Sequence, residues 1–204
     1  MPNFEPASNS AWPRADETYA PLKATTVIYA GDPVVLTSAD SSKTTARAVI
    51  STDYSSSSFS PGILGFACHA ATSDSSGIAN AQIVPSGVSG AAAPIYNVPQ
   101  YSSGLPVDVG TSRSLLRVFV ANNSNSFWGK VTTASVPATA AAAQALVGKG
   151  ATIVVTSATD ITITPSSGTE ILSIIGYDPN DLTRLKFRVK PAYQQSLTGS
   201  LYST

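Results

Sequence analysis

The sequence predicts an all-β protein: a β-barrel or β-sandwich built from short strands, with one short Ala-rich helix and an extended N-terminal arm. Three observations predict this class. Short runs rich in β-branched and aromatic residues recur along the chain, Gly, Pro, Asp, Asn and Ser separate these runs, and a single segment carries the start and stop signals of a helix. Runs of this length and spacing are typical of a sandwich or a barrel.

Residues 1–24 form the predicted arm. Four prolines interrupt this segment, and because proline fixes φ and lacks an amide donor, we expect extended or irregular backbone. The arm also carries three aromatic side chains, Phe4, Trp12 and Tyr19. Aromatic residues dominate both cores and interfaces. Two alternatives therefore stay open: these side chains fold back onto the chain's own core, or they bind a partner protein.

The predicted strands follow the arm in order. In the first half of the chain they cover residues 25–29, 34–36, 44–51, 63–68, 82–84 and 95–98. In the second half they cover residues 115–121, 127–133, 151–156, 160–164, 170–177 and 184–190. The run at 160–164 alternates apolar with polar residues, which is the pattern of a strand with one buried face.

The predicted helix covers residues 137–147, which are rich in Ala. Ser135 is the candidate N-cap, Pro137 stands in the first turn and Gly148 follows the last residue. Pro near the start and Gly just past the end are typical helix boundaries. We therefore expect a short connector that packs on a sheet.

These elements divide the chain into four predicted parts. Residues 1–24 are the arm and residues 25–110 are a barrel-like β lobe. Residues 111–191 are a second β lobe or the continuation of one sandwich, and residues 192–204 are a C-terminal tail.

The composition limits the chemistry that the chain can perform. Its 204 residues include one His, one Cys, 12 basic and 12 acidic side chains, which give a formal net charge of zero. Most enzymes need clustered titratable groups to move protons, bind metals or make nucleophiles. We therefore predict a structural or interaction protein and not an enzyme, with no catalytic residue, no cofactor and no metal site.

The same composition bears on partners and location. Without a basic excess, nucleic acid is not expected as the main partner, because that binding depends on neutralising phosphates. No run approaches the length of an apolar membrane span, so we expect no membrane contact. A single Cys forms no internal disulfide and no signal peptide is visible, which predicts synthesis in a reducing cytoplasm.

The one adjacent pair of reactive side chains is Cys68 and His69. Neighbouring side chains in a strand point to opposite faces, so within a strand these two cannot act together. We expect a buried, inert Cys68 and a surface His69.

The last predicted strand carries the most ordered charge pattern in the chain. Arg184, Lys186, Arg188 and Lys190 share one face, and the apolar residues between them share the other. Two explanations stay open. Edge strands carry Lys and Arg to prevent edge-to-edge aggregation, or the four cations bind acidic residues on a partner protein.

Three segments of the first half resemble the head decoration (cement) proteins of tailed bacteriophages: VIYAGDPVVL at 27–36, AVI at 48–50 and GILGFA at 62–67. In such proteins a Gly-Asp-Pro-Val turn opens a small β-barrel and an Ile-Leu-Gly-Phe strand closes one side of it. This chain is longer than the smallest decoration proteins and has a Pro-rich arm of its own.

The resemblance implies a virion structural protein made in the host cytoplasm and located on the capsid surface. Its partner would be the major capsid protein, whose neighbouring subunits it would bridge, and it would form a homo-oligomer, with a trimer favoured. The partner-binding candidates are then the aromatic residues of the arm and the four cations of the last strand. The alternative is a phage tail, head-fibre or receptor-binding structural protein.

Overall fold

The structure is a computed structural model that describes residues 4–6, 16–40, 43–48, 62–77, 107–108, 113–157, 160–165 and 170–195. The strands predicted at 82–84 and 95–98 lie outside these residues. The described part consists mostly of antiparallel strands with one short α-helix, which confirms the all-β class. The sheets pack as in a sandwich and do not close into a barrel.

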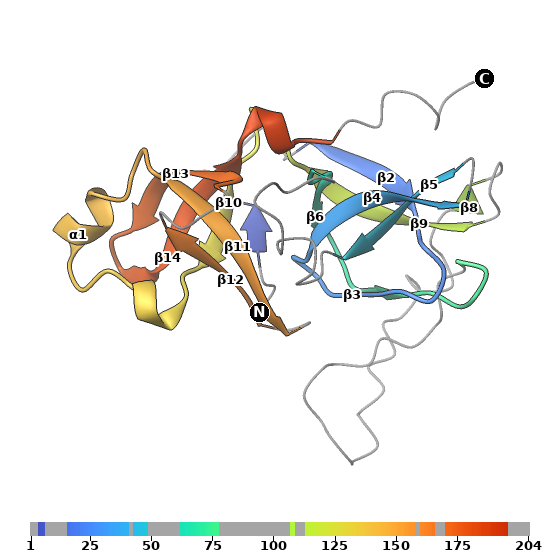
Figure 1. Cartoon of the computed structure of the whole chain (residues 1–204), viewed down its shortest axis with the longest axis horizontal. Coiled ribbons are helices and arrows are strands. Elements are labelled where there is room, and N and C mark those ends of the chain that lie inside the picture. The colour runs from blue at the N-terminus through green and yellow to red at the C-terminus, as the bar shows by residue number, and fades with distance from the viewer. Residues whose placement is uncertain are drawn as a thin grey trace, which may run out of the picture.

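The first sheet lies on the right in Figure 1. Its strands are, in order across the sheet, β2 (Glu17–Pro21), β9 (Arg113–Val120), β6 (Gly65–Ala67), β4 (Pro33–Asp40) and β5 (Lys43–Ala48), with β8 (Val107–Asp108) paired to β9. A separate two-stranded sheet joins β3 (Val27–Ile28) to β7 (Ala71–Thr72). Apolar side chains from both sheets, such as Leu116, Val118 and Ile28, form one core. We call these two sheets together the first lobe.

The second sheet lies on the left in Figure 1. Its order is β1 (Phe4–Pro6), β10 (Phe127–Lys130), β14 (Asp181–Val189), β13 (Leu172–Asp178), β11 (Gly150–Ser157) and β12 (Asp160–Pro165). Two short 3-10 helices, η2 (Thr133–Ser135) and η3 (Pro191–Tyr193), and the helix α1 (Ala140–Gln144) accompany it. We call this unit the second lobe.

Four phenylalanine rings join the two lobes. Phe4, Phe127 and Phe187 come from the second sheet and Phe66 comes from the first. The ring centroid of Phe66 lies 5.1 Å from that of Phe4, 4.3 Å from that of Phe127 and 5.8 Å from that of Phe187. All four side chains are fully buried. Val35 of the first sheet belongs to the same core cluster. Because these rings remove apolar surface from water only when both sheets are present, the lobes share this cluster, beside the separate core of the first lobe.

The observed pairing differs from the predicted division of the chain. β2 from residues 1–24 and β9 from residues 111–191 both belong to the first sheet, and β1 belongs to the second. Of the two predicted alternatives for residues 111–191, this pairing is compatible with the continuation of one sandwich, and the division into four parts stays a prediction. The predicted tail is also part of the fold where it is described, since Gln194 forms a bridge with Ile63.

The helix is shorter than predicted and starts later. Thr139 is its N-cap, and the side-chain oxygen of Thr139 accepts a hydrogen bond from the backbone N–H of Ala142 at 3.1 Å. Ser135 lies in η2 instead. The physical reason is Pro137, which disfavours helical backbone at the residue before it: Val136 has φ −64° and ψ 124°. Gly148 does follow the helix, with a φ of +88°.

Candidate functional site

The best candidate for a binding surface is the outer face of the second sheet along β10 and β14. Its side chains are Trp128, Lys130, Arg184, Lys186 and Arg188, and we call them the basic face. The alternate residues of β14 are buried in the core, as the sequence predicted. The side-chain period of two along a strand therefore presents three cations of β14 on one side of the sheet.

Strand pairing places further groups beside those cations. Lys130 of β10 lies directly opposite Arg184 of β14, and Trp128 lies opposite Lys186. The ammonium nitrogen of Lys186 is 5.9 Å from the centroid of the Trp128 ring, within reach of a cation–π interaction. Like charges directly opposite each other destabilise a pair of strands. The pairing thus places two like charges opposite each other at one end of this face.

The position of β14 bears on the first of the two explanations of its charges, and partner binding stays a prediction. β14 lies between β10 and β13, with hydrogen-bonded partners on both sides. An interior strand has no free edge on which another chain could pair. Protection of an edge strand is therefore not the reason for these cations.

The fourth predicted cation, Lys190, is in a different situation. It follows the end of β14, and its ammonium nitrogen lies 3.1 Å from a carboxylate oxygen of Glu170. Both side chains are about one-third exposed, at 31% and 38%. Because Lys190 lies beyond β14 and is paired with Glu170, we do not include it in the basic face.

The sequence reasoning missed Trp128 and Lys130 as members of this surface. A signal was present, because Phe127 and Gly129 alternate with them and point to the core. Alternation identifies which residues of a strand share a face. Alternation does not identify which other strand pairs with that strand. For this reason Trp128 and Lys130 were not connected with β14.

The three aromatic residues of the predicted arm have different positions. Phe4 is 1% exposed and packs against the rings of Phe66 and Phe187. Of the two alternatives, folding back onto the protein's own core therefore holds for Phe4, which is not free to contact a partner. Tyr19 lies on β2 and is 40% exposed, so it is accessible. Trp12 lies outside the described residues.

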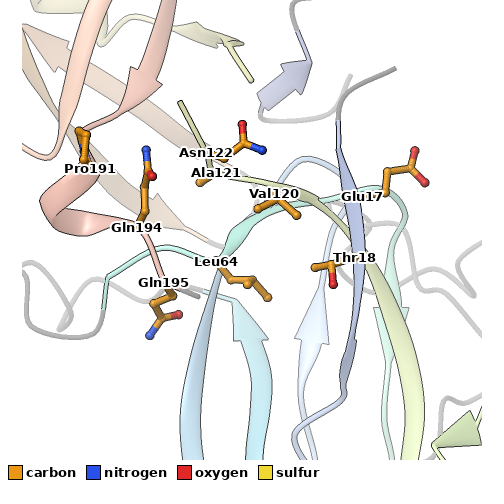
Figure 2. Close-up of a pocket in the computed structure, with 9 residues that line it drawn as sticks. All are labelled: Glu17, Thr18, Leu64, Val120, Ala121, Asn122, Pro191, Gln194 and Gln195. Atoms are coloured by element: carbon orange, nitrogen blue, oxygen red, sulfur yellow. The ribbon is translucent and has the colours of Figure 1, made fainter. Parts of the chain in front are cut away.

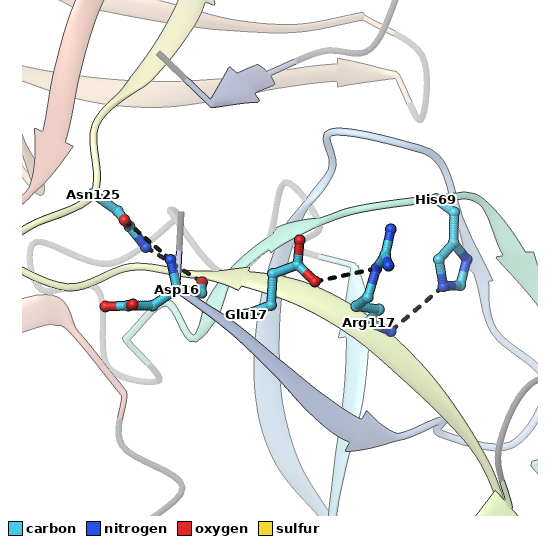
Figure 3. A network of polar contacts seen from close by, with 5 residues as sticks. All are labelled: Asp16, Glu17, His69, Arg117 and Asn125. Carbon is cyan, nitrogen blue, oxygen red and sulfur yellow. Dashed lines mark hydrogen bonds and ion pairs between the residues drawn. The ribbon is translucent and has the colours of Figure 1, made fainter. Parts of the chain in front are cut away.

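A chain of polar contacts runs along the edge of the first lobe (Figure 3). The backbone N–H of Asp16 donates to the side-chain oxygen of Asn125, and the Asn125 amide donates back to the Asp16 carbonyl, both at 3.3 Å. Arg117 lies 3.5 Å from the carboxylate of Glu17, and its backbone N–H donates to Nε2 of His69 at 3.5 Å. The Arg117–Glu17 pair is partly exposed and contributes little to stability. The chain of contacts fixes β2 against β9.

Cys68 and His69 lie in a bend after β6 and not in a strand, so strand alternation does not separate them. Both side chains are half-buried, whereas we expected one buried and one at the surface. Burial raises the pKa of the Cys68 thiol to about 11, and the nearby Glu17 carboxylate adds to this effect. Burial also lowers the pKa of His69, and Arg117 acts in the same direction. A thiol that stays protonated is a weak nucleophile.

A pocket of about 530 Å³ lies between the lobes, where β2 and the end of β9 meet the residues after η3 (Figure 2). Its polar walls are engaged within the protein. Gln195 accepts from the backbone N–H of Leu36 at 2.7 Å and donates to its carbonyl at 3.2 Å. The Asn122 amide donates to the Asp16 carboxylate at 2.6 Å, and the Gln194 amide donates to a backbone carbonyl at 2.8 Å. Of these side chains, Gln195 links the second lobe to β4 of the first, and we assign no ligand to the pocket.

Among the residues that the structure describes, no three His, Cys, Asp or Glu side chains gather where they could hold a metal ion. No helix in this part of the chain is long and apolar enough to span a bilayer. Comparison of the chain with family models, with curated proteins and with solved structures found no match. A functional proposal therefore rests on the residues and their arrangement.

Proposed function

We propose that this protein is a non-enzymatic structural component of a phage virion, which binds the outside of the capsid and stabilises the shell by bridging major capsid subunits. The observation that carries the proposal is the arrangement of the segments that resemble phage head decoration proteins. Pro33 and Val34 of β4 pair with Phe66 and Gly65 of β6, and β4 also pairs with β5. Segments separated in the sequence thus form one three-stranded unit.

The Gly-Asp-Pro-Val turn is the point at which this unit is fastened. The carboxylate of Asp32 is buried and accepts a hydrogen bond from the backbone N–H of Tyr29 at 2.8 Å. Gly31 has a φ of +82°, which residues with a side chain rarely adopt. The backbone N–H of Gly31 donates to the carbonyl of Ala67 at 2.8 Å, and the N–H of Ala67 donates to the Asp32 carbonyl at 2.9 Å. The motif therefore fixes the turn through its backbone hydrogen bonds and the buried carboxylate of Asp32.

The stabilising mechanism is mass action combined with multivalency. A protein that binds only the assembled shell lowers the free energy of the shell relative to dispersed subunits. A homo-oligomer, for which we favour a trimer, contacts several capsid subunits at once, so that modest individual contacts add up to tight attachment. The paucity of titratable groups in the chain supports a role of this kind.

The test is the thermal rupture of capsid shells prepared from the phage that encodes the protein, with and without the purified protein. We expect the protein to co-sediment with the shells and to raise their rupture temperature, because binding favours the intact state. Shells that bind the protein but rupture at an unchanged temperature would contradict the stabilising role. Absence of binding to shells, together with binding to tails or to host cells, would favour the tail, head-fibre or receptor-binding alternative.

A further inference from the structure

We propose that the two lobes are repeats of one five-stranded unit, and that each repeat presents the same contact to a partner. A chain of this kind binds two identical sites at once, and the partner that it fits is an assembly of identical protein subunits. The inference deepens the proposed function and rests on it where that assembly is the shell. The contact is an aromatic side chain beside a cation: Tyr19 with Arg117 on the first lobe, Trp128 with Lys186 on the second.

The strand order is the same in both lobes. Numbered by their order in the chain, five strands of each lobe lie in the sheet as first, fifth, fourth, second and third. These strands are β2, β9, β6, β4 and β5 in the first lobe, and β10, β14, β13, β11 and β12 in the second. In each lobe a parallel bridge joins a residue just after the first strand to the third strand, Leu22 to Ala46 and Val131 to Ile163. An order repeated in this way indicates an internal repeat.

The hairpins formed by the second and third strands also agree position by position. In β4 and β5, residues 34–40 pair with residues 43–48, and the register shifts once, just before the last pair. In β11 and β12, residues 151–157 pair with residues 160–165, and the register shifts at the same place. β-Bulges are specific features of a fold and not random defects, so an equivalent shift supports a common unit.

The turn before each hairpin is built by the same backbone hydrogen bonds. Gly31 and Gly148 both have a positive φ, of +82° and +88°. The N–H of each glycine donates at 2.8 Å to a carbonyl of the fourth strand, that of Ala67 or Ile174. The N–H of the same strand residue donates back at 2.9 Å to the carbonyl of the residue after the glycine. The Gly-Asp-Pro-Val turn therefore has a counterpart at residues 148–151.

This equivalence places Tyr19 and Trp128 at the same position of the repeat. Each lies three residues before the bridge residue of its lobe, and each has a cation opposite it on the fifth strand. The neighbouring outward positions of that strand differ between the repeats: they are Leu115 and Phe119 in one, Arg184 and Arg188 in the other. An aromatic ring beside a cation is therefore common to both repeats, although its surroundings are not.

The rings make the contact and the cations lie beside them. Tyr19 is 40% exposed, Trp128 is half-buried, and the ammonium nitrogen of Lys186 lies 5.9 Å from the Trp128 ring centroid. Arg117 and Lys186 have interaction partners within the protein, and the strand pairing places Glu5 opposite Trp128. The contact therefore does not depend on unbalanced charge. Trp and Tyr are among the residues that most often dominate protein interfaces, and a contact made twice attaches tightly to a repeating partner.

A hairpin exchange tests the repeat without any partner. Residues 33–48 are replaced by the sequence of residues 150–165, which has the same length. We expect this chimera to unfold in a cooperative thermal transition, because the inward and outward positions are kept. The control inserts residues 151–166 instead, which shifts the register by one residue, turns buried side chains outward and should abolish the transition. Equal melting of the two chimeras would refute the repeat.

Substitutions assayed on purified capsid shells test the duplicated contact. Because tight attachment needs both contacts, Tyr19→Ala and Trp128→Ala should each weaken co-sedimentation with shells by about tenfold or more. The control Val27→Ala truncates a side chain that is 49% exposed in β3, outside the common unit, and should bind as the wild type does. Where an alanine variant melts below the wild type, leucine replaces alanine at that position. Wild-type affinity in either ring variant would refute the duplicated contact.

The outcomes separate this inference from the proposed function. If the wild-type protein binds shells and one ring variant binds equally well, the duplicated contact fails and the capsid role stands. If the wild-type protein binds purified phage tails and not shells, the proposed function fails, and the same variants measured on tails decide whether the contact is duplicated. If it binds neither assembly, the duplicated contact fails together with the proposed function.

Discussion

At the scale of single residues, the environment of Cys68 shows how the fold suppresses reactivity. The thiol is half-buried just after the interior strand β6, where it loses part of the solvation that a thiolate needs. The carboxylate of Glu17 adds an unfavourable negative charge, and together these effects raise the pKa of Cys68 to about 11. The nearby Arg117 opposes the shift without cancelling it.

We predict that Cys68 reacts slowly in the native protein. A rise in pKa from 9.0 to about 11 leaves about 100-fold less thiolate at pH 8 than in the unfolded chain. The rate of modification by a disulfide reagent, measured with and without denaturant, tests this. Cys68 is the single cysteine, so the signal needs no separation from other thiols. Equal rates in the two states would contradict the raised pKa.

The same shift predicts a pH dependence of stability. Below pH 9 the thiol is protonated in both states, and its contribution to stability is complete. As the pH rises from about 9 to about 11, only the unfolded chain ionises, so the free energy of unfolding falls. Denaturant titrations at pH 8 and pH 10 should show this fall in the wild-type protein and a smaller one in Cys68→Ala.

At the scale of elements, β1 depends on a slot in its neighbour β10. Phe4 lies opposite Gly129 in the strand pairing, and a Cβ atom at Gly129 would come within 2.6 Å of the Phe4 ring and 2.9 Å of the Phe187 ring. The absence of a side chain at Gly129 therefore makes room for the phenylalanine cluster. A three-residue strand has few hydrogen bonds of its own, so burial of Phe4 is what fixes it to the sheet.

Gly129→Ala is accordingly expected to destabilise the protein by about 1–3 kcal/mol, because the new methyl group overpacks a filled core. Gly176→Ala is the matched control in the same sheet, since a Cβ atom there meets nothing closer than 3.5 Å. Denaturant unfolding of both variants measures the difference. In a Phe4→Ala background the Phe4 ring is absent, so Gly129→Ala should lower the free energy of unfolding by less. An unchanged loss of stability would show that the new methyl group does not act by displacing Phe4.

At the scale of the whole molecule, the segment Tyr193–Gln195 joins the lobes by forming backbone hydrogen bonds with Ile63, as a neighbouring strand would. The backbone N–H of Ile63 donates to the carbonyl of Tyr193 at 2.7 Å, and the N–H of Gln195 donates to the carbonyl of Ile63 at 2.9 Å. The Gln195 side chain continues this ladder, because its amide satisfies both backbone groups of Leu36. One glutamine thus stands in for a peptide unit of a neighbouring strand.

Gln195→Ala should lower the free energy of unfolding by about 1–3 kcal/mol, since it leaves a buried backbone donor and acceptor without partners. Gln195→Glu should cost less if the carboxylate still accepts from Leu36. Gln144→Ala, an exposed substitution of the same type in α1, is expected to be neutral. Calorimetry measures the melting temperature of each variant. Equal melting temperatures for Gln195→Ala and Gln144→Ala would show that the Gln195–Leu36 hydrogen bonds do not stabilise the contact between the lobes.

Local patterns in the sequence were sufficient to predict the β class, most strands of both lobes and the two faces of β14. Each of these follows from residue preferences and side-chain period within a few neighbouring positions. The scarcity of titratable side chains, from which a non-catalytic role was inferred, is likewise a property of the sequence.

Only the tertiary structure decided that Phe4 is core, that β9 belongs to the first sheet, that β14 is interior, and that Trp128 and Lys130 lie beside its cations. Each of these facts depends on which strand lies next to which. β1 and β10 are far apart in the sequence, and their pairing is selected by the fit of Phe4 against Gly129. Such fits arise from packing between distant segments, which the preferences of neighbouring residues do not encode.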